Sequence, residues 1–217
     1  FSASSHKIAV DELGVDVEAF SPNPTLRSLK RRELGLGDQE VLIIFVGTVQ
    51  PRKRLEILVR AVARLVDFRA KLLIVGRIRN DYKQCLDELV SRAGLQQIVT
   101  FAGTVSHADL PGSFAAADVG VWPGDPSVMA CGLPIIARRE PVTEPIVTSN
   151  GYLFTRPEHL DGCLKELVAN VEKRLQMGKS SREIARRYLD ARILTAQTLD
   201  LYNRLIESPP SPSPVRV

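Results

Sequence analysis

A glycine, a basic loop and a helix follow one apolar stretch of this chain, in an order suited to holding phosphate. Gly47 comes directly after the apolar run 41–46, and Arg52 and Lys53 stand just before an amphipathic segment. A glycine lets the backbone approach an anion closely, a helix N-terminus offers N–H groups, and a lysine adds a full positive charge. The spacing therefore predicts a phosphate site, with cations at a solvated helix start as the alternative.

The same arrangement recurs further along the chain. The apolar run 71–75 ends at Gly76, and the run 98–101 leads to Gly103. Parallel strands end at one edge of a sheet, and ligands of open α/β domains bind at that edge. We therefore expect the three glycines to lie together, with Arg77 as a second phosphate contact or, alternatively, as plain surface charge.

Alternating strands and helices predict an α/β domain with a doubly wound parallel sheet and helices on both faces. Apolar spacing of three and four predicts a helix after Lys53 with Val66 on its inner face, and one at about 81–93 with Cys85 on its inner face. Ser106 to Asp109 resembles a capping box that opens a helix reaching about 116. The other predicted elements are a helix at 5–13, a basic helix at 25–34, strands at 119–122 and 133–137, and helices at about 157–175, 180–189 and 191–206.

The composition is that of an ordinary globular protein. The chain has 217 residues, 44% of them hydrophobic and 25% charged, enough for one well-filled core or two small domains. No apolar run approaches the roughly 18 residues that span a bilayer. The three cysteines form no CxxC pair, which argues against a disulfide framework or a zinc site and for a reducing, cytoplasmic location.

The net charge of +4 comes from basic residues that are interspersed with acidic ones. No aromatic-rich basic stripe is present, so we expect no nucleic-acid partner. The basic helix at 25–34 leaves peripheral contact with an anionic membrane as an open alternative to a solvated face.

The order of these motifs resembles the nucleotide-sugar-binding half of glycosyltransferase family 4 (group 1), which has the GT-B fold. The resemblance covers about residues 5–206, nearly the whole chain. It is carried by Gly47 with Pro51 and Lys53, by Val75 and Gly76, and by the segments 94–105, 117–123, 129–137 and 144–153.

The resemblance implies retaining transfer of a sugar from a nucleotide-diphosphate sugar, with no metal and no separate cofactor. Lys53 would be the catalytic residue, because it neutralises a diphosphate whose negative charge grows as the glycosidic bond breaks. The Gly103 turn would face the base, and the N–H groups of Ser127 and Val128 would face a phosphate. The implied donor-binding positions are Gly47, Thr48, Arg52, Lys53, Gly76, Arg77, Gly103, Thr104, Val105, Asp125, Ser127 and Val128.

GT-B enzymes have two α/β halves with the catalytic cleft between them, and this chain resembles only the second. It begins without a Met or a signal peptide, so we expect a piece of a longer protein whose N-terminal acceptor domain is its partner. Residues 1–37 would be linker and leading helices, 38–206 the Rossmann-like donor-binding domain, and 207–217 a disordered Pro/Ser tail. Such a chain would bind a donor but transfer no sugar alone.

Two departures from the family pattern concern the first strand and its surroundings. Thr48 stands where the family usually has an arginine, which removes one phosphate cation unless Arg52, Arg54 or Arg77 replaces it. A strand expected just before Gly14 is also missing.

A third departure leaves catalytic competence open. Neither of the family's two glutamates precedes Met129, and the connection from Trp122 is several residues short, with Asp125 as the candidate substitute. The chain is either a degenerate copy or lacks a mobile loop of the natural protein. The alternatives to an enzyme are a non-catalytic nucleotide-sugar-binding or scaffolding module, or a doubly wound protein for another phosphorylated ligand. Without a GxGxxG or Walker sequence, dinucleotide and P-loop functions are disfavoured.

Overall fold

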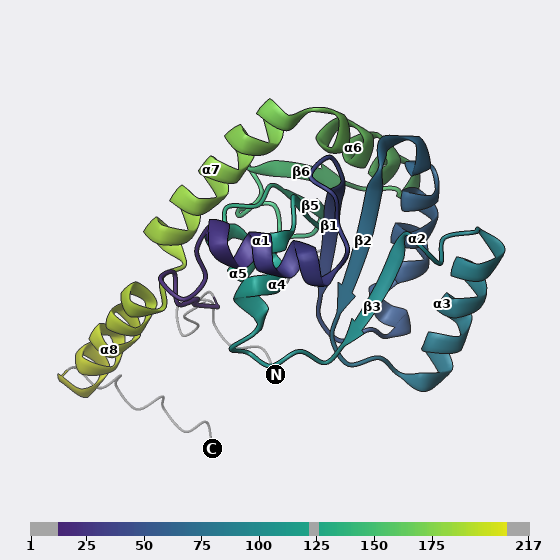
Figure 1. Cartoon of the computed structure of the whole chain (residues 1–217). Helices are drawn as coiled ribbons and strands as arrows, with labels where there is room; N and C mark the ends of the chain where they lie inside the picture. Colours follow the sequence, from purple (N-terminus) through teal and green to yellow (C-terminus); the bar gives the residue numbers. More distant parts are fainter. Residues whose placement is uncertain (1–12, 122–125, 208–217) are drawn as a thin grey trace, which may run out of the picture.

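Six parallel strands form a single sheet in the computed structural model, which describes residues 13–121 and 126–207 (Figure 1). The strand order is β3-β2-β1-β4-β5-β6. The first strand, β1, is therefore central, with β2 and β3 on one side of it and β4, β5 and β6 on the other. The strands are β1 (Val41–Val46), β2 (Ala70–Val75), β3 (Val99–Gly103), β4 (Val119–Val121), β5 (Ile135–Arg138) and β6 (Gly151–Phe154).

Helices cover both faces of the sheet, which confirms the doubly wound α/β fold expected from the sequence. The helices are α1 (Pro24–Glu33), α2 (Leu55–Ala63), α3 (Asn80–Arg92), α4 (Leu110–Ala116), α5 (Ser127–Ala130), α6 (Pro157–Ala169), α7 (Val171–Tyr188) and α8 (Ala191–Glu207), with short 3₁₀ turns η2 (Pro51–Lys53) and η3 (Val66–Phe68).

Alternate side chains of β1 enter two separate hydrophobic cores. Ile43 and Phe45 pack with α2, α3 and α6, whereas Leu42 and Ile44 pack with α4, α5 and the segment around Phe20. Successive side chains of a strand point to opposite faces, and a strand buried on both faces therefore reads as a continuous apolar run. This is why the strand at 41–46 could be predicted with its bounds.

α1 precedes the sheet in sequence but belongs to the packed body, because it lies against α4 (Figure 1). Its N-terminus is capped by Asn23, whose side chain accepts a hydrogen bond from the amide of Leu26. α8 leaves the body at the end of α7 and exposes Leu199, Tyr202, Leu205 and Ile206. No described helix is both long enough and apolar enough to cross a membrane.

Several predicted elements have different bounds. The helix expected at 157–175 ends at Ala169, and after Asn170, whose side chain caps α7, a single helix runs through the predicted break near 180. The strand β6 was not predicted, because four residues with two half-buried side chains give no readable pattern. The helix opened by Ser106 starts only at Leu110, although Ser106 does accept the Asp109 amide.

Two side chains predicted to face the core are exposed. Val66 is 51% exposed because α2 ends at Ala63 and the chain turns through η3. Cys85 is exposed on α3, beside the buried Leu86. The helix predicted at 5–13, Trp122 and the tail from 208 lie outside the described residues, apart from Leu13, which is not helical.

Candidate functional site

The three glycines predicted to meet lie side by side at the carboxyl edge of the sheet. β1, β2 and β3 are neighbours, the amide of Gly47 donates to Val75 O (2.9 Å), and that of Gly76 donates to Gly103 O (2.7 Å). Gly76 has φ of +135°, and a Cβ built on it would lie 2.0 Å from Gly47 O. Only glycine allows this contact, so the loops after β1 and β2 leave the sheet pressed together.

The two loops stay paired beyond their glycines. The amide of Val49 donates to Arg77 O (2.9 Å), and the amide of Arg79 donates to Val49 O (3.2 Å). Thr48, the residue before Val49, is exposed, as is Arg77. Arg77 therefore lies on the loop that is paired with the loop of Thr48. Its side chain is a candidate to supply the positive charge that Thr48 does not carry.

Lys53 ends the turn η2 at the same edge. Its half-buried side chain borders a small crevice of about 20 Å³ that is also lined by Phe45, Val121 and Phe154. Phe45, Val121 and Phe154 come from β1, β4 and β6, so the half-buried side chain of Lys53 lies beside the ends of three strands. Arg52 beside it is exposed.

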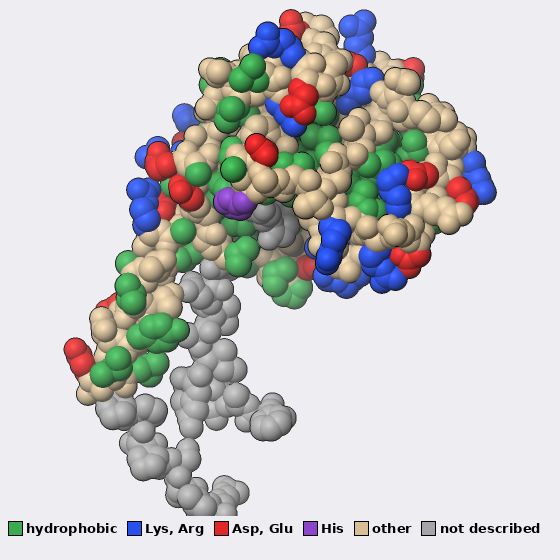
Figure 2. All heavy atoms as spheres, turned by 60° about the horizontal axis from the view of Figure 1, so that its bottom comes forward, with side chains coloured by type: hydrophobic (Ala, Val, Ile, Leu, Met, Phe, Trp, Pro, Cys, Tyr) green, Lys and Arg blue, Asp and Glu red, His purple; other side chains and the backbone are tan. Residues whose placement is uncertain are grey.

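The cations of these loops fall into two groups. Arg54 pairs with Glu56 (3.3 Å), and Arg79 pairs with Asp81 (2.6 Å), whose pKa is lowered by the Arg79 hydrogen bond. Arg52, Lys53 and Arg77 have no ion-pair partner within the described part of the chain. Figure 2, in which the bottom of Figure 1 comes forward, shows Lys and Arg side chains gathered on this side of the molecule.

The third loop lies next to these two. Gly103 ends β3 with φ of +69°, Thr104 is exposed, and Val105 packs partly against the core beneath α4. Thr104 and Val105 line one end of a cavity of about 660 Å³ that continues between α1, α4 and the exposed face of β3.

α5 opens at Ser127, as expected, but the side chains of its first residues face inward. Ser127 is 5% exposed and Val128 is 3% exposed, and Val128 packs against Gly120 of β4. A contact from these two residues to a ligand would therefore come from the backbone. Asp125, the candidate substitute for a glutamate, lies outside the described residues.

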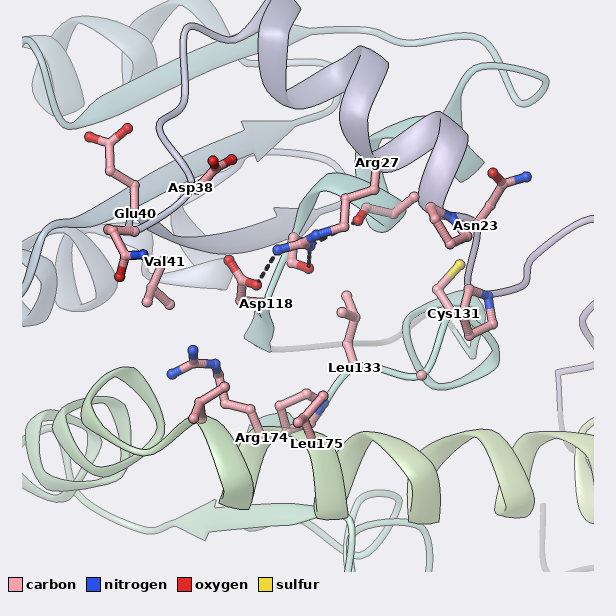
Figure 3. Close-up of a pocket in the computed structure, with 18 residues that line it drawn as sticks. Asn23, Arg27, Asp38, Glu40, Val41, Asp118, Cys131, Leu133, Arg174 and Leu175 are labelled. Carbon is pink, nitrogen blue, oxygen red and sulfur yellow. Dashed lines mark hydrogen bonds and ion pairs between the residues drawn. The ribbon is translucent and has the colours of Figure 1, made fainter.

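A second hollow, of about 630 Å³, lies at the opposite, amino edge of the sheet (Figure 3). Arg27 donates to the carbonyl oxygens of residues 115–117 and to Asp118 (2.7 Å), and Arg174 donates to Leu167 O (2.7 Å) and Val168 O (2.8 Å). Burial lowers the pKa of Arg174. These arginines satisfy helix ends and a carboxylate, so this cavity is not the anion site that the sequence predicts.

The basic helix α1 likewise turns its charge inward. Arg31 is 7% exposed and bonds Asp118, Ala116 O, Gly37 O and Glu40 O. Arg27 and Arg31 thus hold the start of β4 against the body, and a contact between this helix and a membrane would depend on its remaining cations.

Sequence reasoning missed Tyr82, which is buried in the first turn of α3. Its hydroxyl donates to Glu56, and burial, with the Glu56 carboxylate second, raises the pKa of Tyr82. A lone Tyr at the start of a helix carries no recognisable motif, and only the packing of α3 on α2 reveals the contact.

The fold matches that of solved glycosyltransferase structures, one of which is the C-terminal domain of a group 1 protein. The sequence model of the family "Glycosyl transferases group 1" matches residues 27–184, and the chain belongs to this family.

Relatives and solved structures agree with this assignment. The chain is 30% identical over 212 residues to a D-inositol 3-phosphate glycosyltransferase of Stackebrandtia nassauensis, covering 87% of this chain and 47% of the relative. Anabaena Alr3699/HepE in complex with UDP and glucose superposes with a TM-score of 0.82 at 22% identity, covering 90% of this chain and 56% of that one. The C-terminal domain of the group 1 protein LpcC from Francisella tularensis superposes with a TM-score of 0.70 at 20% identity, and the match covers 81% of this chain and 98% of that one. The chain thus spans about half the length of the first two.

Proposed function

We propose that this chain is the donor-binding half of a retaining glycosyltransferase and holds a nucleotide-diphosphate sugar at the carboxyl edge of its sheet. The observation that carries the proposal is a set of cations (Arg52, Lys53 and Arg77) that have no ion-pair partner among residues 13–121 and 126–207. They lie beside two loops that are pressed together at Gly47 and Gly76. A diphosphate supplies the negative charge that such cations lack. The HepE structure, whose fold the chain shares, contains UDP and glucose.

In this proposal Lys53 is the catalytic residue. Cleavage of the glycosidic bond moves negative charge onto the leaving diphosphate, and an ammonium group fixed beside it stabilises the transition state more than the ground state. Arg77 adds a second positive charge from the paired loop. The base lies by Thr104 and Val105, and the acceptor is held by an N-terminal half of the same protein.

The second candidate function is a non-catalytic nucleotide-sugar-binding module. The observation that favours it is the absence of both family glutamates before Met129. Such a module would keep the donor site and lose only the transfer reaction, so both candidates predict nucleotide binding by this chain.

The test is a titration of the chain with UDP, GDP and ADP and with their glucose conjugates, followed by thermal unfolding and calorimetry. A ligand that binds only the folded state raises the melting temperature once its concentration exceeds its dissociation constant. We expect one base to bind, with Lys53→Ala and Arg77→Ala each weakening it. No shift with any nucleotide would contradict the donor site.

Catalysis needs a separate measurement with the full-length protein. Release of the nucleoside diphosphate and transfer of sugar, lost in Lys53→Ala, would support the enzyme. Nucleotide binding without either would support the non-catalytic module.

A further inference from the structure

A series of polar contacts at the first turns of α2 and α3 connects the loop that carries Lys53 with the loop that carries Arg77. Arg54 follows Lys53 and pairs with Glu56, Glu56 accepts the hydrogen bond of Tyr82, and the amide of Tyr82 donates to Asp81 (2.9 Å). Asp81 in turn binds Arg79 (2.6 Å) of the second loop. Arg52, Lys53 and Arg77 take no part in these contacts among the described residues. The contacts nevertheless connect the loop that carries Lys53 to the loop that carries Arg77.

Arg54 is the member of this network that directly follows Lys53 in the sequence. It has φ of +50° and ψ of +44°, a left-handed conformation that costs energy for any residue with a Cβ. This conformation turns the backbone out of η2, which ends at Lys53, and into α2. The Arg54 side chain makes no capping hydrogen bond at the start of α2, and the Arg54 amide donates to Pro51 O (3.0 Å). A side-chain contact to the first turn of α2 comes instead from α3.

Tyr82 supplies such a contact. It is 8% exposed, and its phenol lies close to the backbone of Leu55 and Glu56 at the first turn of α2. A tyrosine hydroxyl is protonated at neutral pH, and burial raises the pKa of Tyr82 further, so the hydroxyl is a donor to Glu56. Glu56 is then held between Tyr82 and Arg54, and the half-exposed Arg54 gains a fixed partner.

We propose that Tyr82, acting through Glu56 and Arg54, is a positioning residue that holds Lys53 in the orientation needed to bind the donor's diphosphate. This inference rests on the proposed function and adds to it a residue that does not touch the ligand. A purely structural Tyr82 would stabilise the fold without changing how Lys53 meets an anion.

The experiment is a double-mutant cycle on the full chain, with binding of UDP, GDP or ADP (whichever the wild type binds) measured by calorimetry. The variants are Tyr82→Phe, Lys53→Gln and the pair. We expect Tyr82→Phe to weaken binding about three- to tenfold in the wild-type background, which is at the lower end for coupled neighbours, and to have no further effect with Lys53→Gln.

Two further variants make the cycle decisive. Glu56→Gln, at a partly exposed position, should weaken nucleotide binding as Tyr82→Phe does, and only when Lys53 is present. This variant tests the proposal even if Tyr82→Phe folds poorly. Tyr188→Phe is the matched control, because this tyrosine is 54% exposed at the end of α7 and should leave the affinity unchanged.

The outcomes separate this inference from the proposed function. Wild-type binding that is weakened by Lys53→Gln but not by Tyr82→Phe or Glu56→Gln overturns the positioning role alone. Equal losses in both Lys53 backgrounds also overturn it, since the tyrosine would then act independently of Lys53. No nucleotide binding by the wild-type chain overturns the proposed function and this inference together.

Discussion

The two edges of the sheet both carry arginines beside a cavity, but the arginines are used differently. At the amino edge, Arg27, Arg31 and Arg174 are bound by carbonyl oxygens or by Asp118. At the carboxyl edge, Arg52, Lys53 and Arg77 lack ion-pair partners among the described residues. A hollow of about 630 Å³ lies at the amino edge, although the positive charge there is already satisfied.

This difference shows that neither cavity size nor the number of cations identifies an anion site here. A buried guanidinium with several carbonyl partners has no capacity left for a ligand, and removing it leaves those partners without hydrogen bonds. A solvated cation held by an ordered loop keeps its capacity. The amino edge should therefore respond to mutation with lost stability and the carboxyl edge with lost affinity.

The largest effect is expected at the amino edge from Arg31→Ala. Breaking the buried pair with Asp118 should lower the free energy of unfolding by about 3–5 kcal/mol. Urea unfolding measures this loss, and Arg32→Ala, next along α1 and exposed, is the matched control. Nucleotide affinity of the remaining folded protein should not change. A selective loss of affinity would contradict the assignment of this edge to structure.

The next effect is expected from Gly76→Ala at the carboxyl edge. A Cβ there meets Gly47 O and occurs at φ of +135°, so we expect the unfolding free energy to fall by about 3 kcal/mol and nucleotide binding to weaken. The control is Gly112→Ala in α4, where a Cβ meets nothing within 4 Å. Equal stability of the two variants would show that the loops can separate freely.

Lys53→Ala should change affinity and leave stability nearly unchanged. Loss of a charged hydrogen bond costs about 1.5–3 kcal/mol, which corresponds to about 10- to 150-fold weaker nucleotide binding. Lys179→Ala, an exposed cation on α7, should have no effect on binding. Calorimetry and thermal unfolding of both variants test this, and unchanged affinity for Lys53→Ala would remove it from the site.

A smaller, pH-dependent effect is expected at Asp190, which lies outside both edges. Hydrogen bonds from Arg192 lower the pKa of Asp190 below its ordinary value of 3.8. A carboxylate with a lowered pKa stabilises the fold above its unfolded-state pKa, and this contribution disappears as the pH falls through the folded-state value. The unfolding free energies of wild type and Asp190→Asn, measured with urea, should therefore differ at pH 7 and converge as the pH falls below the folded-state pKa. A constant difference would show that ionisation of Asp190 plays no part.

Much of the fold was readable because burial leaves a simple pattern. The strand bounds 41–46 and the buried face of α2 followed from apolar runs and from three-and-four spacing. The predictions failed where tertiary contacts decide. β6 exists because Gly151 to Phe154 pairs with β5, and α7 continues through position 180 because it packs on α5.

The candidate site was predictable in part for the same reason. Glycines after apolar strands must meet if the strands are parallel neighbours, which placed Gly47, Gly76 and Gly103 together. The contact of Tyr82 with Glu56 joins residues 26 positions apart, and no local pattern encodes it. The inward-facing side chains of Ser127 and Val128 were likewise decided by packing against β4.

The sequence by itself determined the parallel sheet, the glycine edge and the family, because these depend on hydrophobic periodicity and on short motifs in a fixed order. The tertiary structure alone decided which cations remain available. Arg31 and Lys53 are both basic residues close to a helix end, and a sequence assigns them the same charge. Only the packing of α1 against the start of β4 surrounds Arg31 with Asp118 and carbonyl oxygens, while Lys53 lies at the carboxyl edge without an ion-pair partner among the described residues.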